Sequence, residues 1–326
     1  MIYCINPDCK QRQNPNNIDR CQACGTPLII GGYQLLKPLR SLDPRSYTDV
    51  FEAEDKQGTR KVIKVLKDSS TQLVEMFVRE AFTLQLLNHP GIPKVEIDGY
   101  FTFTPNNSTQ ELHCLAMEKI DGQNLEQWLR KRDRLSQNLA LNWLRQLIEI
   151  IEVLHKNKFF HRDIKPSNII LKPDGRLVLI DFGSVRGITD TYLPKIKQQT
   201  ITAIISGGYT PPEQIDGKAV PQSDFYALGR TFVHLLTGKS PLELPKNSRT
   251  GKLIWKKYAP QISQFLADFL DEMMAVSPFD RPQDTAIILR SLTLRGLFVQ
   301  SVLRCLNSAS LRGLIAALLL AGTLYR

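Results

Sequence analysis

The run from residue 161 to residue 183 constrains this chain more than any other stretch of its sequence. It opens with the letters HRDIKPSN and closes with Asp181-Phe182-Gly183. In between, two apolar segments flank a Lys-Pro-Asp-Gly turn, which predicts an antiparallel hairpin. Because a hairpin returns the chain to its starting point, we expect Asn168 and Asp181 to lie side by side. An amide and a carboxylate placed in this way can bind a divalent cation that bridges phosphates.

A lysine in a predicted strand gives a second constraint. Residues 62–66 read as a buried strand with Lys64 at its centre, and a buried lysine needs an anion or a phosphate ligand. Residues 73–87 then show apolar positions at helical spacing, and Glu80 falls within that apolar stripe. We therefore expect Glu80 to pair with Lys64.

These motifs resemble, in kind and in order, those of protein kinases. The HRDIKPSN run resembles the catalytic loop, and Asp181-Phe182-Gly183 resembles the metal-binding DFG motif. The resemblance covers about residues 33–294. It implies an α+β, two-lobed protein kinase fold, with a small lobe at about 33–118 and a larger helical lobe at about 119–294.

The resemblance also implies a role for each residue of the site. Asp163 would accept the proton of the incoming hydroxyl, and Lys165, with Ser206 nearby, would stabilise the transferred phosphoryl group. Asn168 and Asp181 would hold Mg²⁺. The nucleotide-binding residues implied for ATP are Val50, Val62, Lys64, Glu80, Met117, Glu118 and Ile120. The lysine two residues after Asp163 resembles serine/threonine kinases, so the expected partner is a protein substrate with a serine or threonine acceptor.

Further motifs follow in the kinase order. Pro211-Pro212-Glu213 resembles the end of the activation segment, and Arg281 matches the arginine that pairs with Glu213. Asp224 resembles the start of the buried helix that anchors the catalytic loop. Arg162 implies a pocket for a phosphate on the activation segment, for which the best-placed acceptors are Thr200 and Thr202.

Two close cysteine pairs open the chain, Cys4 with Cys9 and Cys21 with Cys24. Four thiolates suit tetrahedral zinc, and a segment of residues 1–28 is too short to build a useful core without such a ligand. The pattern resembles a zinc ribbon, and its place before a kinase domain resembles a group of cyanobacterial serine/threonine kinases. A redox or disulfide pair and unmetallated thiols stay open as alternatives.

The loop that would cover the nucleotide phosphates departs from the family pattern. It is expected at residues 43–50, where the sequence has no glycine. Glycines at such a loop let backbone N–H groups approach phosphates. Asp43 adds an anion there, which Arg45 could offset by direct contact. The alternative function is therefore a nucleotide-binding pseudokinase, or a zinc-stapled interaction scaffold with little transfer activity.

Composition agrees with an intracellular globular enzyme. Apolar residues make up 42% of the chain, and no apolar run follows Met1, so we expect no signal peptide and a reducing, cytoplasmic compartment. The formal net charge is +10, but arginine and aromatic residues are not interleaved. We therefore expect a solvated basic surface and no nucleic-acid partner.

The tail, residues 295–326, is basic and apolar. Its longest uncharged stretch, Gly313 to Tyr325, has thirteen residues, whereas a membrane-spanning helix needs roughly twenty. Three interpretations stay open for it: a helix packed on the kinase domain or on another protomer, an anchor at the inner face of a membrane, and disorder.

Overall fold

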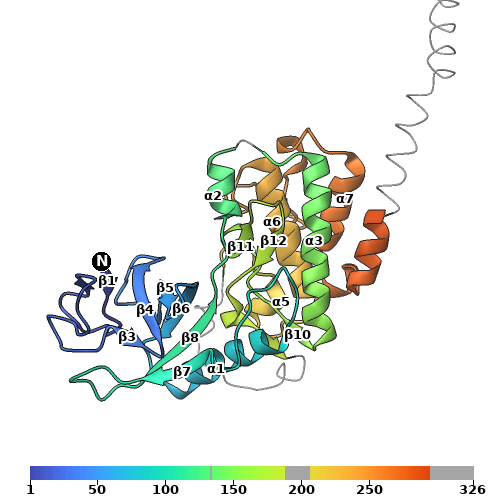
Figure 1. Ribbon diagram of the computed structural model, residues 1–326. Helices are drawn as coiled ribbons and strands as arrows, with labels where there is room; N and C mark the ends of the chain where they lie inside the picture. The colour runs from blue at the N-terminus through green and yellow to red at the C-terminus, as the bar shows by residue number, and fades with distance from the viewer. Residues whose placement is uncertain (133, 188–205, 294–326) are drawn as a thin grey trace, which may run out of the picture. The chain divides into compact units, whose positions relative to one another are not determined.

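The computed structural model describes residues 1–132, 134–187 and 206–293. The chain divides into two compact units, Met1–Arg281 and Pro282–Arg326. In the second unit residues 285–293 are helical, and Oδ1 of Asp284 accepts the backbone N–H of Ile287 near the helix start. The first unit contains a strand-rich lobe and a helical lobe (Figure 1).

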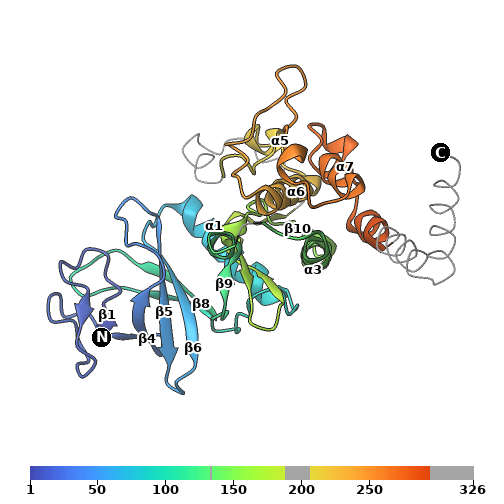
Figure 2. The ribbon, with the colours of Figure 1, turned by 90° about the horizontal axis from the view of Figure 1, so that it is seen from above.

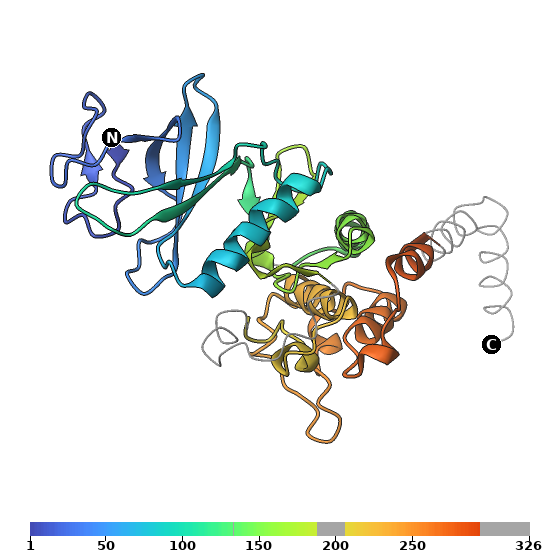
Figure 3. The ribbon, with the colours of Figure 1, turned by 90° about the horizontal axis from the view of Figure 1, so that it is seen from below.

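The strand-rich lobe is built on one six-stranded antiparallel sheet and one helix. The helix, α1, spans Thr71–Leu86. Figure 3 shows it running along the side of the sheet that faces the helical lobe, and it contacts the short helix η2, Phe182–Ser184. In spatial order the strands are β3 (Ile29–Ile30), β4 (Tyr33–Pro38), β5 (Thr48–Asp55), β6 (Arg60–Leu66), β8 (Leu112–Glu118) and β7 (Tyr100–Phe103).

Strand alternation sorts the side chains of this sheet onto two faces. Val50 lies opposite Lys64, and Val62 lies opposite Met117, so these four residues share one face. Their neighbours along the strands, such as Phe51, belong to the other face, where a buried hydrophobic cluster forms. The two-residue period of the strands therefore fixes which face Lys64 presents.

The four-cysteine segment packs against the sheet. Its first strands, β1 (Ile2–Tyr3) and β2 (Gln13–Asn14), pair with each other, and Ile5 is buried in the same cluster as Phe51. Nη1 of Arg12 also lies 2.7 Å from Oδ2 of the buried Asp49 in β5. The segment thus shares a core with the sheet.

The connection from the cysteine segment to the six-stranded sheet differs from expectation. Residues 26–32 read as a linker in the sequence, but β3 lies within them and pairs with β4. Gly31 and Gly32 join these two strands with positive φ angles of 55° and 87°, as a tight hairpin turn with primed geometry requires. A Cβ on Gly31 would also lie 2.7 Å from the ring of Phe101, so a larger residue at position 31 would displace that ring.

The helical lobe surrounds two long helices, α3 (Gln137–Lys156) and α6 (Gln222–Thr237), shown from above in Figure 2. Leu144, Ile148 and Ile151 form the buried face of α3, as their spacing predicts, whereas Leu141 and His155 are half-buried. Helix α6 is buried along nearly its whole length. Among the described residues, this lobe also has the helices α2 (Leu125–Arg130), η1 (Pro166–Asn168), α5 (Pro212–Ile215), η4 (Lys256–Tyr258), α7 (Gln264–Met273) and η5 (Pro278–Asp280).

The predicted hairpin is present at the edge of this lobe. Strands β11 (Ile169–Leu171) and β12 (Leu177–Leu179) pair antiparallel, with β9 (Gln123–Asn124) on the outer side of β11. At the open end of the hairpin, the N–H of Ile180 donates to the carbonyl of Asn168 at 2.8 Å. The backbone next to Asp181 therefore meets Asn168. A second small pair joins β10 (Phe159–Phe160) to β13 (Arg186–Gly187).

Within the described residues no helix has the length and apolar character that crossing a membrane requires. The tail at residues 295–326, for which an anchor is one of three open interpretations, lies outside the described residues.

Candidate active site

A cavity of about 640 Å³ lies between the two lobes. Its walls come from the residues just after β4, from β5, β6, α1 and the end of β8, and from the chain that follows β8. The open end of the β11–β12 hairpin, opposite its turn, closes the other side. Every residue predicted to contact the nucleotide lines it: Val50, Val62, Lys64, Glu80, Met117, Glu118 and Ile120. Lys165, Asn168 and Asp181 line it as well.

The pair predicted between strand and helix is present. Nζ of Lys64 lies 2.8 Å from each carboxylate oxygen of Glu80 and 3.0 Å from Oδ1 of Asp181. Burial alone would lower the pKa of Lys64, but the charges of Asp181 and Glu80 reverse this effect and raise it. The nearby ammonium group of Lys64 in turn holds the pKa of Asp181 well below its usual range. Lys64 and Asp181 are therefore both charged at neutral pH.

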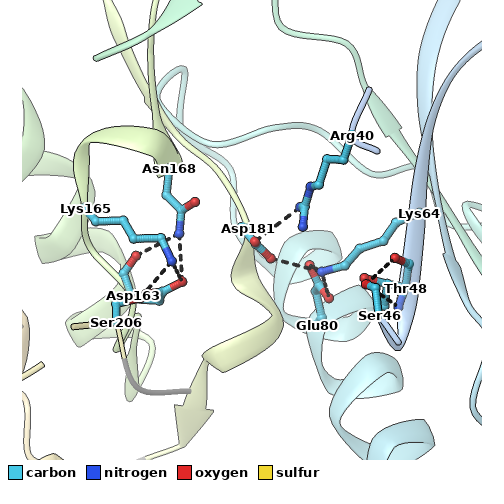
Figure 4. A network of polar contacts seen from close by, with 10 residues as sticks. All are labelled: Arg40, Ser46, Thr48, Lys64, Glu80, Asp163, Lys165, Asn168, Asp181 and Ser206. Atoms are coloured by element: carbon cyan, nitrogen blue, oxygen red, sulfur yellow. Dashed lines mark hydrogen bonds and ion pairs between the residues drawn. The ribbon is translucent and has the colours of Figure 1, made fainter. Parts of the chain in front are cut away.

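A second network surrounds Asp163 (Figure 4). Nζ of Lys165 donates to Oδ2 of Asp163 at 2.8 Å, and Nδ2 of Asn168 donates to the same oxygen at 2.9 Å. The hydroxyl of Ser206 donates to Oδ1 of Asp163 at 2.5 Å and accepts from Lys165 at 2.8 Å. The structure thus brings together the residues predicted for the transfer step. Asp163 does not line the cavity itself, but two of its hydrogen-bond partners, Lys165 and Asn168, do.

A buried aspartate fixes the chain that carries these groups. Asp224, at the start of α6, accepts the backbone N–H groups of His161 at 2.9 Å and Arg162 at 2.8 Å. Nε2 of His155 lies 3.0 Å from the same carboxylate. The backbone of Arg162 is left-handed, with φ of 70°, as is that of Asp181 with φ of 66°. Such conformations are costly for residues other than glycine and are typical of functional sites.

Arg162 lies in a basic region. Burial lowers its pKa to about 10, and the neighbouring charges of Arg186 and Arg79 add to this effect. The charges of Asp224 and Asp163 oppose this effect, and a further anion near Arg162 would do the same. The acceptors predicted for a phosphate at this place, Thr200 and Thr202, lie outside the described residues.

The predicted pair of Glu213 and Arg281 forms a bidentate salt bridge. Nη1 and Nη2 of Arg281 lie 2.6 Å and 3.0 Å from the two carboxylate oxygens of Glu213. Arg281 also donates to the backbone carbonyls of Ala275, Val276 and Gln222. This network ties the helix α5 to the segment that follows α7.

The phosphate-covering loop begins earlier than predicted. It spans residues 39–47, between β4 and β5, so Thr48 and Val50 already belong to a strand. In this structure Arg45 is exposed, offsets the charge of Asp43 by direct contact at 3.2 Å, and does not line the cavity. Sequence reasoning missed Arg40 instead, which lines the cavity and places Nη2 3.4 Å from Oδ2 of Asp181. The predicted loop begins at residue 43, four positions after the observed start at residue 39, so Arg40 lies outside the predicted loop.

The four N-terminal cysteines converge. Their Sγ atoms all lie within 4.8 Å of one another, with 3.6 Å between Cys4 and Cys24 and between Cys9 and Cys21. These separations exceed the roughly 2.05 Å of a disulfide. Four sulfurs about 2.3 Å from a tetrahedral zinc are about 3.8 Å apart, so this cluster fits such an ion.

The comparisons with known proteins agree with this geometry. Residues 46–291 match the protein kinase domain family, and the chain belongs to that family. It is 35% identical over 308 residues to serine/threonine-protein kinase B of Synechocystis sp., covering 90% of this chain and 52% of that protein. It is also 35% identical over 278 residues to serine/threonine-protein kinase PknA of Nostoc sp., covering 82% of this chain and 48% of the relative.

A more distant relative is serine/threonine-protein kinase PrkC of Bacillus subtilis, 29% identical over 265 residues, which cover 78% of this chain and 39% of PrkC. The chain thus spans about half the length, or less, of these curated relatives. Their names confirm the predicted resemblance to bacterial serine/threonine kinases.

Proposed function

We propose that this chain is a serine/threonine protein kinase domain, which transfers the γ-phosphoryl group of ATP to hydroxyls of a protein substrate. The observation that carries the proposal is the convergence of two networks at one cavity. One joins Asp163, Lys165 and Asn168, and the other joins Lys64 to Glu80 and Asp181. The names of the relatives support the same activity.

The cavity face of the sheet would hold the nucleotide. Val50 and Val62 offer apolar surface to the adenine ring, with Met117 as the gatekeeper at the back of the cavity. The N–H of Glu118 already donates to the carbonyl of Lys94 at 2.8 Å, so Glu118 would meet adenine through its carbonyl oxygen. Ile120 would do so through its backbone N–H. Lys64, held by Glu80, would bind the α- and β-phosphates.

The second network would carry out the transfer. The carboxylate of Asp163 would accept the proton of the substrate hydroxyl while the hydroxyl oxygen bonds to the γ-phosphorus and the β–γ bridging oxygen leaves. Lys165 would offset the negative charge of the phosphoryl group in flight. Asn168 and Asp181 supply the amide and carboxylate oxygens that suit Mg²⁺, which when bound would neutralise the phosphates. Ser206, bonded to Asp163 and Lys165, would hold both groups in place.

The basic region at Arg162 would serve activation. A phosphate on Thr200 or Thr202 would offer these guanidinium groups an anion and so order the activation segment. Mass spectrometry after incubation with Mg-ATP tests this part. An unmodified activation segment in an active enzyme would contradict it.

A transfer assay tests the proposed activity. The chain is incubated with γ-labelled ATP, Mg²⁺ and a generic protein substrate, and the labelled amino acid is identified after acid hydrolysis. We expect phosphoserine and phosphothreonine, and about 100- to 10,000-fold less label with Asp163→Asn. Equal label from both proteins would refute the transfer mechanism.

A nucleotide-binding pseudokinase is the second candidate. The absence of glycine from the loop at residues 39–47 favours this candidate. The contact of Arg40 with Asp181 also favours it, because Asp181 is a proposed ligand of Mg²⁺. The same assay separates the two, because a pseudokinase would bind nucleotide and transfer no label.

We further propose that Cys4, Cys9, Cys21 and Cys24 hold a structural zinc ion as a ribbon-like segment. The supporting observation is that their four Sγ atoms lie within 4.8 Å of one another, as four ligands of one tetrahedral ion would. Elemental analysis of the purified protein should find about one zinc per chain, and Cys21→Ser should lose it. Cys114→Ala should keep the metal, since Cys114 lies in the sheet core. A zinc-free wild type purified without chelator would contradict the proposal.

The cytoplasmic location of the protein, with or without attachment to a membrane, stays a prediction. Fractionation of the full chain beside one that ends at Leu294 tests it. If both stay in the soluble fraction, a membrane anchor in the tail is excluded, and a cytoplasmic location is supported.

A further inference from the structure

The loop over the cavity offers unusually few backbone donors to an anion. It holds nine residues, 39–47, none of them glycine, and Pro44 has no N–H. Four of the other N–H groups already donate within the loop or to β5, namely those of Leu39, Asp43, Arg45 and Ser46. At most four of nine therefore remain for a ligand. A loop of this kind cannot cradle phosphates through its backbone as a glycine-rich loop does.

Leu39 and Arg40 of the loop line the cavity, and Arg40 is the charged one of the two. Leu39 is fixed to β5, because its N–H donates to the carbonyl of Val50 at 2.8 Å. Arg40 follows it directly, and Figure 4 shows its side chain reaching toward Asp181. The contact is a single one, with Nη2 of Arg40 at 3.4 Å from Oδ2 of Asp181. The side chain of Arg40 is 55% exposed, so it has room to move.

The other cations that line the cavity have closer partners. Lys64 lies 2.8 Å from Glu80, Lys119 lies 2.8 Å from Asp121, and Lys165 lies 2.8 Å from Asp163. Arg40 thus makes the weakest contact among these four cavity cations. Its partner, Asp181, is also the carboxylate that we assign to the magnesium ion. A cation bound at Asp181 would remove the attraction that holds Arg40 there.

We propose that Arg40 is a phosphate-binding residue that replaces the glycine backbone of the covering loop and contacts the phosphates of the bound nucleotide. This inference rests on the proposed nucleotide site. A guanidinium group presents two parallel N–H donors to a phosphate. It therefore combines a positive charge with a defined hydrogen-bond geometry. In the free protein the same group rests on Asp181 and balances its charge.

The proposal predicts an effect that depends on the phosphates of the ligand. We would measure the binding of ATP and of adenosine by calorimetry, with and without Mg²⁺, so that no readout depends on turnover. For Arg40→Ala we expect ATP affinity to fall about tenfold or more, because a charge-assisted contact is lost. Adenosine affinity should stay within about twofold, since adenosine carries no phosphate. Arg40→Lys should recover part of the loss.

A matched control is available in the same loop. Arg45→Ala removes an equal charge from the loop, but Arg45 pairs with Asp43 away from the cavity, so ATP affinity should not change. ATP affinity unchanged in Arg40→Ala, or lost equally in Arg45→Ala, would overturn the proposal. An equal loss for adenosine would also overturn it, because it would show a structural role. A wild type that binds neither ligand would instead refute the nucleotide site on which the proposal rests.

Discussion

Nζ of Lys64 lies 3.0 Å from Oδ1 of Asp181, although 117 positions separate these residues in the chain. One comes from the sheet of the small lobe, and the other follows the β11–β12 hairpin of the large lobe. This ion pair therefore joins the lobes across the cavity. The carboxylate of Glu80 completes it from α1, so three of the elements that line the cavity meet at a single ammonium group.

Removing this ammonium group should cost stability as well as activity. Lys64→Met leaves the buried Glu80 without its cation, which should lower the free energy of unfolding by about 3–5 kcal/mol. Adding Glu80→Leu should restore most of that stability, because an apolar pair of similar volume replaces the buried ions. Urea denaturation measures both changes. The double variant should stay inactive, and a double variant less stable than the single one would contradict this description of the pair.

The contact between the cysteine segment and the sheet should also be measurable. Arg12→Met removes the 2.7 Å contact to Asp49 and the hydrogen bonds to the carbonyls of Cys4 and Ile5. Because Lys67 still lies 3.0 Å from Asp49, we expect a loss of about 1–3 kcal/mol in unfolding free energy. The exposed Arg20 of the same segment is the control, and Arg20→Met should change stability by less than about 0.5 kcal/mol. Equal effects would mean that the segment does not dock as described.

Zinc removal should destabilise the small lobe beyond the cysteine segment. The segment shares a hydrophobic cluster with the sheet, so unfolding it would expose Phe51 and its neighbours to water. A strong chelator should therefore lower the melting temperature of the whole domain, and added zinc should restore it. Cys21→Ser should melt at the chelated temperature whether chelator is present or not. An unchanged melting temperature in the chelated wild type would contradict a structural metal.

Acid should weaken the fold through His161. Burial lowers the pKa of His161, although the charges of Asp224, Asp163 and Asp181 oppose this effect. The unfolded imidazole takes up a proton below about pH 6.5 while the folded one does not, so stability falls as the pH drops below that value. The slope from this one group is at most about 1.4 kcal/mol per pH unit. His161→Phe should flatten the stability curve between about pH 6.5 and 5, and an unchanged slope would exclude this role.

The local parts of the site could be predicted from sequence. The turn between β11 and β12 can be predicted from a few neighbouring residues of the sequence. Because the two ends of an antiparallel hairpin lie next to each other, Asn168 and Asp181 must then be neighbours. Helical and strand periods likewise placed Glu80 and Lys64 on facing surfaces. In each case a short-range rule determines the geometry.

The parts that could not be predicted depend on distant contacts or on loop length. No pattern near Arg12 indicates that it will meet Asp49, because that contact follows from how a whole segment packs on the sheet. The strand β3 is only two residues long, so it carries no period to detect. The role of Arg40 cannot be predicted in this way, because no sequence pattern marks the residue at which β4 ends and the loop begins.

The proposed function requires that the cavity lined by Lys64 and Asp181 binds ATP together with Mg²⁺. We would titrate the wild type with ATP in a calorimeter, once in Mg²⁺ and once in a chelator of divalent ions. We predict one saturable site whose affinity rises with Mg²⁺, and an Asp181→Asn variant in which that rise is lost. A wild type that binds no nucleotide in either condition would contradict the claim.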